Sequence, residues 1–181
     1  IAQALYARVR DLPIVSPHGH TNPQWFAQNK PFENPAVLFV TPDHYIYRML
    51  YSQGVKLEDL GLHRLDGGPV ETDPRQIWRR FAQHYYLFRG TPTRLWIDHA
   101  FETLSGLNER LSASNADHHY DVISAALQTP AFLPRALFER FNIEVIATTE
   151  GPLDELKWHQ MIRDSGWKGR VITAYRPDSV V

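Results

Sequence analysis

Two histidines separated by one glycine close a short apolar stretch near the start of the chain, PIVSPHGH at residues 13–20. Side chains along a strand alternate between its two faces, so residues two apart point the same way. We therefore expect His18 and His20 to project together from a strand end, with Gly19 letting the backbone bend towards a ligand. Such a pair is typical of metal ligands or of groups that hydrogen-bond a substrate, and two exposed loop histidines are the alternative.

Polar residues also follow two later runs that read as strands, at 143–149 and 170–175. Active sites of parallel α/β folds lie at the carboxyl ends of strands, so we expect these residues to share one edge with the two histidines. Arg176 can hold a carboxylate through two hydrogen bonds, and a salt bridge to Asp178 or to the next helix is the alternative. Glu150 is interpreted as a charge that favours the start of the following helix.

A third polar cluster lies on a helix expected at 43–53. His44 and Arg48 are four residues apart and share one helical face, with Tyr45 beside them. A tyrosine near a cationic group can donate or accept a proton, and a surface helix with a half-buried tyrosine is the alternative. No role is assigned to three further histidines, His118, His119 and His159. His118 and His119 are expected on a helix surface.

The elements that must position these residues are three strands and a set of helices. The strands are expected near 13–18, 143–149 and 170–175. Five helices are expected at 2–10, 43–53, 72–89, 91–104 and 152–164. Two more are expected from 114 to a break at 129–130, and from that break to 141. Thr21-Asn22-Pro23 predicts a turn, and Thr41 is expected to cap the second helix. The aromatic helix at 72–89 is expected to be core or a subunit contact, and Trp96 on the next helix is expected in the core.

The strand, helix and strand over 143–175 form a βαβ unit, whose two strands should be parallel. The last strand ends the chain with no helix to cover it, although parallel sheets are normally covered on both faces. Either the chain is a small open α/β domain or it is part of a larger barrel. We favour the barrel, with residues 21–141 as a large helical insertion after the first strand.

The composition excludes several classes of protein. A hydrophobic content of 43% with 22% charged residues is ordinary for a soluble globular domain of 181 residues. The net charge of −1 gives no electrostatic case for nucleic acid or an anionic membrane as partner. The absence of cysteine excludes thiolate catalysis, so a metal site must use His, Asp or Glu. With no membrane-length apolar run and no signal peptide we expect a cytoplasmic protein, and the start at Ile1 suggests that the natural N-terminus is absent.

The ordered set of these segments resembles the uronate (glucuronate) isomerase family of the amidohydrolase superfamily. The resemblance runs over nearly the whole chain and includes the long helical insertion. It rests on the residues at 13–20, 31–34, 43–48, 54–55, 147–154 and 176–178.

The resemblance implies an α/β fold, namely the N-terminal part of a (β/α)8 TIM barrel of amidohydrolase type. It implies conversion of D-glucuronate to D-fructuronate and of D-galacturonate to D-tagaturonate, with a small-molecule uronate as partner. A divalent metal, with zinc the expected ion, is implied but is not strictly required in the family. By residue, the resemblance implies that His18 and His20 bind the metal. It also implies that Tyr45 and His44 are catalytic and that Arg176 and Arg48 bind the substrate.

Two positions depart from the family pattern. The family reads Thr-Thr-Asp where this chain has Thr148-Thr149-Glu150, and Lys-Trp-Arg where it has Ile46-Tyr47-Arg48. Both departures indicate a divergent branch. Family members are also more than twice as long, so we expect these residues to supply three of eight barrel strands and to be inactive as an isomerase alone.

Two other functions remain open at the level of sequence. One is a metal-dependent amidohydrolase acting on a small anionic substrate, in which the His-x-His metal would generate hydroxide. The other is a helical interaction module whose aromatic helix forms an interface, and a homo-oligomer is left open. Hydrolysis of a neutral amide needs neither the Tyr45 cluster nor Arg176, which favours the isomerase.

Overall fold

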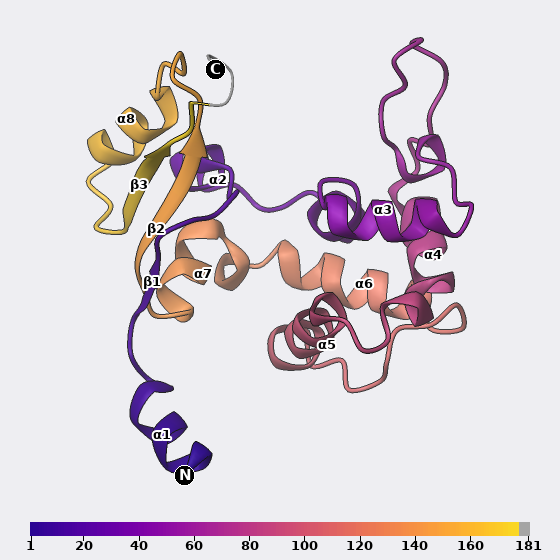
Figure 1. Ribbon diagram of the computed structural model, residues 1–181, viewed down its shortest axis with the longest axis horizontal. Coiled ribbons are helices and arrows are strands. Elements are labelled where there is room, and N and C mark those ends of the chain that lie inside the picture. The colour runs from indigo at the N-terminus through magenta and orange to yellow at the C-terminus, as the bar shows by residue number, and fades with distance from the viewer. Residues whose placement is uncertain (178–181) are drawn as a thin grey trace. The chain divides into compact units, whose positions relative to one another are not determined.

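Three parallel strands in the order β1-β2-β3 form the sheet of the computed structural model, which describes residues 1–177 (Figure 1). They are β1 (Ile14–Ser16), β2 (Ile143–Glu150) and β3 (Arg170–Tyr175). All three predicted strands and the parallel βαβ pairing are therefore confirmed. Asp178, proposed from the sequence as a partner of Arg176, lies outside the described residues.

The register brings the carboxyl ends of the strands to one edge of the sheet. Ser16 pairs with Ile146, and β2 pairs with β3 continuously up to Glu150 opposite Tyr175. Because parallel strands run in the same direction, whatever follows each strand emerges at the same edge. His18 and His20 follow β1 and Arg176 follows β3, so these three predicted site residues leave the sheet at this edge.

The chain forms two compact units, and the sheet belongs to the first. Residues 1–31 and those from 130 onward make up this unit, and residues 32–129 make up the second. The helices of the first unit are α1 (Ala2–Val9), α2 (Pro23–Gln28), η4 (Pro130–Phe132), α7 (Pro134–Arg140) and α8 (Lys157–Asp164).

One aromatic cluster joins three of these helices to the sheet. Phe26 of α2, Phe138 of α7 and Ile162 of α8 are buried together, and Ile146 of β2 packs against them. The indole of Trp167 stacks on Phe26, with ring centroids 5.8 Å apart. Burial of these rings, which bring the largest apolar areas of any side chains, holds α8 beside the sheet.

Helix α2 was not predicted, because Thr21-Asn22-Pro23 was interpreted only as a turn, whereas a helix starts at Pro23. The Asn22 side chain accepts a hydrogen bond from the backbone N–H of Gln24 at 3.0 Å, and Pro23 occupies the first helical turn. Asparagine followed by proline is a local start signal for a helix, so the sequence did contain the information. Asn29 ends the helix in a left-handed conformation with φ 49°.

The helix predicted at 152–164 is shorter than expected and begins only at Lys157. Leu156 precedes it with φ 54°, in the left-handed region that interrupts a helix. Leu153 is 87% exposed, so it does not contribute to an apolar helix face. Ile162, which lies within the helix, is buried.

The second unit is helical, as the sequence predicts. Its elements are the π-helical turn η1 (Ala36–Val40), α3 (His44–Ser52), η2 (Glu58–Leu60), α4 (Pro74–Gln83), η3 (Tyr85–Phe88), α5 (Pro92–Ser105) and α6 (Ala116–Leu127). Asp43, not Thr41, caps α3, because the Thr41 hydroxyl donates to the carbonyl of Leu60 instead. Among the described residues, no helix combines the length and the apolar character needed to span a lipid bilayer.

The predicted aromatic helix at 72–89 is divided into α4 and η3, and it forms the core of the second unit. Trp78, Phe81, Tyr85 and Phe88 are all at most 1% exposed. The Trp78 indole N–H donates to the carbonyl of Ala116 at 2.9 Å, which satisfies its one polar group. These four side chains are therefore internal, and the hypothesis that they form a subunit interface is wrong.

Two other predictions about side-chain burial in this unit also need correction. Trp96 was expected in the core but is 44% exposed on α5. His119 was expected on a helix surface but is fully buried, whereas its neighbour His118 is exposed. A helix turns by 100° per residue, so adjacent residues face different directions and only the packing of neighbouring helices decides which is covered.

Candidate active site

The carboxyl edge of the sheet gathers the backbone of the predicted site residues of the first unit. His18 and His20 follow β1, Glu150 ends β2, and Arg176 follows β3. The backbone N–H of Arg176 donates to the carbonyl of Glu150 at 3.1 Å, so the β2–β3 pairing continues one residue past the strand. The Arg176 side chain is exposed at this edge.

The two imidazoles after β1 lie next to each other. The ring centroids of His18 and His20 are 5.0 Å apart with an interplanar angle of 84°, and both residues are exposed. The Ser16 hydroxyl is 3.4 Å from the carbonyl of His18, and the Thr149 hydroxyl donates to the carbonyl of Gly19 at 2.8 Å. The sequence-based expectation that the two rings project together is met by this geometry.

The donor chemistry of this pair fits part of a metal site. Neutral imidazole is a common zinc ligand, and two exposed rings this close are of the right type and proximity to share one ion. Within residues 1–177, no group of three histidine, aspartate or glutamate side chains lies close enough to hold a metal. The described residues therefore offer two of the four ligands that zinc usually takes.

A buried polar group on the helix side of β2 was missed by the sequence analysis. His159 of α8 has its Nε2 atom 2.8 Å from the hydroxyl of Thr148, and that hydroxyl also donates to the carbonyl of Ile172 at 3.2 Å. A carboxylate oxygen of Glu150 lies 3.7 Å from the same Nε2 atom. Thr148 and Glu150 are two residues apart on the strand and so face the same way, a spacing that could have pointed to a shared partner on the next helix.

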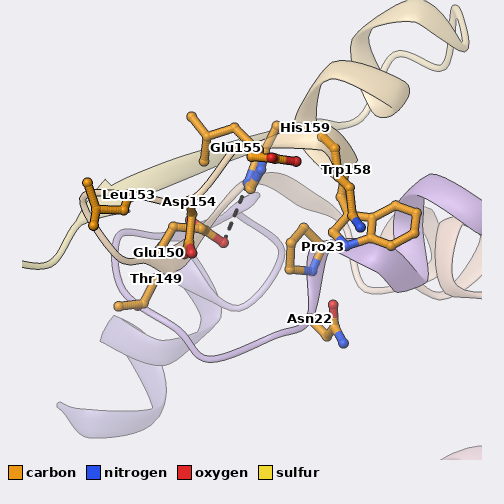
Figure 2. Close-up of a pocket in the computed structure, with 11 residues that line it drawn as sticks. Asn22, Pro23, Thr149, Glu150, Leu153, Asp154, Glu155, Trp158 and His159 are labelled. Carbon is orange, nitrogen blue, oxygen red and sulfur yellow. Dashed lines mark ion pairs between the residues drawn. The ribbon is translucent and has the colours of Figure 1, made fainter. Parts of the chain in front are cut away.

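Glu150 and His159 line a pocket of about 450 Å³ (Figure 2). The other lining residues are Asn22, Pro23, Thr149, Leu153, Asp154, Glu155, Leu156, Lys157 and Trp158. Figure 2 shows Trp158 beside Pro23, and the ion pair of Glu150 with His159 further along the pocket. The second carboxylate oxygen of Glu150 is buried and has no hydrogen-bond partner among the described residues.

The expected role of Glu150 as a charge at a helix start is not what the structure shows. Its carboxylate faces His159 inside α8, and α8 begins well after it, at Lys157. The Asp154 side chain instead accepts a hydrogen bond from the backbone N–H of Gly151 at 2.7 Å and closes the turn between β2 and α8. The Glu150 side chain is only 11% exposed, so its carboxylate has little contact with water.

The predicted cluster around Tyr45 forms within the second unit. The Asp43 carboxylate accepts hydrogen bonds from the backbone N–H groups of Tyr45 and Ile46, which starts α3. Burial of Ile46 anchors the helix and leaves the opposite face to solvent, where Tyr45 is 68% exposed. The His44 and Tyr45 rings have centroids 4.2 Å apart, and Arg48 is exposed on the same helix.

The structure thus assembles each predicted set within its own unit. His18 and His20 lie together in the first unit, and Arg176 lies at the same sheet edge. His44 and Tyr45 lie together in the second unit, with Arg48 one turn along α3.

Comparison with known proteins identifies a family along the whole chain. A family model described as glucuronate isomerase matches residues 1–181. A uronate isomerase from Mesorhizobium japonicum is 70% identical over 181 residues, which are all of this chain and 39% of that protein. A uronate isomerase from Xanthomonas euvesicatoria is 64% identical over the same length, which is 38% of that protein. The chain therefore spans less than two-fifths of the length of these curated relatives.

Solved structures agree with this result. The crystal structure of glucuronate isomerase from Caulobacter crescentus matches with a TM-score of 0.94 and 59% identity, over 99% of this chain and 37% of that one. A uronate isomerase from Thermotoga maritima matches with a TM-score of 0.84 over 97% of this chain, at 24% identity, which bears on the fold alone. Because the family model covers every residue, the chain belongs to the glucuronate isomerase family.

Proposed function

We propose that this chain carries part of the active site of a uronate isomerase that interconverts D-glucuronate and D-fructuronate, and D-galacturonate and D-tagaturonate. The observation that carries the proposal is the imidazole pair of His18 and His20 at the carboxyl edge of a parallel sheet, in a chain that the family model matches throughout. We place the reaction in the cytoplasm.

The proposed architecture is a (β/α)8 barrel of the amidohydrolase type. The order β1-β2-β3, with α8 as the crossover between the last two strands, is what the start of such a barrel requires. The exposed side chains of Ile14 and Val15 on β1 are those that further strands and helices would cover. In this proposal, residues 21–141 remain the insertion between the first and second strands.

Each predicted residue has a chemical task in the proposed reaction. Aldose–ketose isomerisation moves a proton between C2 and C1 and requires a base, a polarised carbonyl and a proton for the oxygens. The guanidinium of Arg176 would hold the uronate carboxylate through two parallel hydrogen bonds, and Arg48 would add a second positive charge for the substrate. The phenol of Tyr45, beside His44, would exchange a proton with a substrate oxygen.

His18 and His20 would hold the divalent metal that the family implies, with zinc as the expected ion. When bound, such an ion would supply a Lewis acid for substrate oxygens. The two imidazoles themselves must present their ring nitrogens to one point, and the 5.0 Å separation of their ring centroids is in keeping with that task. The proposal does not require the metal to be indispensable.

The test is an isomerase assay on the full-length gene product that contains these residues, with D-glucuronate and D-galacturonate and detection of the ketose. We expect Tyr45→Phe to lower kcat by about a hundredfold, the lower range for loss of a general acid or base. Tyr51→Phe is the matched control, because Tyr51 is 61% exposed on the same helix. The 181-residue chain alone should show no turnover.

Arg176→Lys separates substrate binding from proton transfer. We expect it to raise KM with little change in kcat, because lysine keeps the charge but loses the two-point hydrogen bond. If no ketose forms from either uronate while small acyl-amide acids are hydrolysed, the isomerase proposal fails and a metal-dependent amidohydrolase takes its place.

A further inference from the structure

The end of strand β2 makes a side-chain contact with the loop between the two histidines. The Thr149 hydroxyl donates to the carbonyl oxygen of Gly19 at 2.8 Å, across 130 residues of sequence. Thr149 is partly buried, so this hydrogen bond is shielded from competing water. The Gly19 peptide is bonded directly to His20, so whatever fixes this carbonyl also limits where the His20 side chain can go.

The same loop lies close to the backbone of β2. A Cβ atom on Gly19 would lie 3.3 Å from the carbonyl oxygen of Ala147, which is tighter than ordinary contact. Glycine is therefore favoured here because the segment after β1 lies close to the backbone of β2, rather than because of an unusual backbone angle. Two independent contacts from β2, one hydrogen bond and one close approach, set the position of the segment between His18 and His20.

Thr149 is available for this task because its neighbour faces the other way. Thr148 uses its hydroxyl on Ile172 and His159, on the side of the sheet that packs against α8. Successive strand residues point to opposite faces, so Thr149 cannot join that group. Of the two consecutive threonines, one joins β2 to the helix layer and the other joins β2 to the histidine loop.

We propose that Thr149 is a positioning residue for His18 and His20, which holds their loop in the conformation that binds a metal. The inference rests on the proposed function, in which these imidazoles bind a divalent ion. Outer partners that orient metal-ligating histidines usually act on the ring itself, and here the hydroxyl acts on the peptide between the two rings. Removal of the hydroxyl should loosen the pair without removing either ligand.

The variants can isolate the hydrogen bond from the shape of the side chain. Thr149→Val keeps the branched shape and removes the hydroxyl, whereas Thr149→Ser keeps the hydroxyl. Gly19→Ala is an independent change, because it displaces the same peptide from the Ala147 carbonyl while Thr149 stays intact. Thr173→Val is the matched control, because Thr173 pairs with Thr148 on β3, faces away from the loop and is exposed.

The measurement is calorimetric titration of zinc into the metal-stripped full-length gene product, with the melting temperature recorded for every variant. We expect Thr149→Val and Gly19→Ala to weaken zinc binding by about tenfold, the lower range for loss of an outer partner, with Thr149→Ser and Thr173→Val within about twofold of wild type. The inference would be overturned if folded Thr149→Val bound zinc with wild-type affinity. It would also be overturned if Thr149→Ser were weakened equally, or if the wild type did not bind zinc. If Thr149→Val does not fold, the zinc affinity of Gly19→Ala is compared with that of wild type and of Thr173→Val in its place. The uronate assay on the wild type tests the proposed function separately, since isomerase activity can be present whichever way the zinc titration turns out.

Discussion

The Nε2 atom of His159 lies 2.8 Å from the hydroxyl oxygen of Thr148. That hydroxyl also donates to the carbonyl of Ile172 at 3.2 Å, so it lies between the helix and the next strand. The same Nε2 atom also faces the Glu150 carboxylate at 3.7 Å. This chain of contacts joins α8 to both β2 and β3 through a histidine whose side chain is only 11% exposed.

Loss of the His159 ring should destabilise the first unit. His159→Ala leaves an empty space beside the Glu150 carboxylate, one oxygen of which is already buried without a hydrogen-bond partner among residues 1–177. We expect a loss of about 2 kcal/mol in the free energy of unfolding, measured by urea denaturation. His159→Gln, which keeps an N–H donor, should recover part of this loss, and His118→Ala on the exposed face of α6 should have no effect. Equal losses for alanine and glutamine would show that the hydrogen bond to Thr148 contributes little.

Removal of the Tyr85 hydroxyl should change how stability depends on alkaline pH. Burial, together with the hydrogen bond that the phenol donates to Asp98 at 2.7 Å, raises the pKa of Tyr85 well above its ordinary value. A raised folded-state pKa stabilises the fold fully below the unfolded value of about 10, and this stability is lost as the pH rises further. Wild type should therefore lose stability above about pH 10, and Tyr85→Phe should lose less over the same range.

The matched control for that experiment is Tyr86→Phe, because Tyr86 is the adjacent residue and is 59% exposed. At neutral pH, Tyr85→Phe should cost about 1 kcal/mol in denaturant unfolding, since Asp98 keeps its ion pair with Arg94. An alkaline profile for Tyr85→Phe that matches wild type would contradict the assignment.

Protonation of Asp117 should weaken the second unit at acid pH. Hydrogen bonds from the Arg79 and Arg75 guanidinium groups hold the pKa of Asp117 below its ordinary value. A depressed folded-state pKa contributes stability above the unfolded value of about 4, and that stability disappears as the pH falls through the folded value. Asp117→Asn should be less stable than wild type at pH 7 and should converge with it at low pH, in urea unfolding series at matched ionic strength. Glu102→Gln, an exposed change on α5, is the control, and a constant gap at all pH values would refute the prediction.

Truncation of Trp78 tests whether the aromatic segment is core. Trp78 is fully buried, its ring centroid is 5.4 Å from that of Phe81, and its N–H is bonded to the carbonyl of Ala116. Trp78→Ala should lower the free energy of unfolding by about 3–5 kcal/mol, the usual cost of such a cavity. Trp96→Ala should cost far less, because Trp96 is 44% exposed. A loss of self-association in Trp78→Ala without loss of stability would restore the interface hypothesis.

Several features of the fold and site could be predicted because their signals are local in sequence. Runs of apolar and β-branched residues located all three strands, and the His-x-His spacing placed two imidazoles together at a strand end. The helix α5 was predicted almost to the residue, because Thr91-Pro92 starts it and Gly106 ends it with φ 70°. Asn22-Pro23 carried a start signal of the same kind that was read as a turn.

Other features depend on which segments meet in space, and no local pattern encodes that. His159 and Glu150 are separated by a turn whose length was misjudged, so their pairing depended on where α8 begins. The bond from Thr149 to Gly19 joins residues 130 positions apart, and it exists because the β1–β2 register brings those two backbones together. By itself, the sequence determined the strands and the histidine pair, since periodicity and spacing act over a few residues, and the resemblance of its ordered motifs pointed to the family that the family model matches. The tertiary structure alone decided which hydroxyl holds the histidine loop and which histidine is buried, because hydrogen-bond partners and burial depend on packing between distant segments.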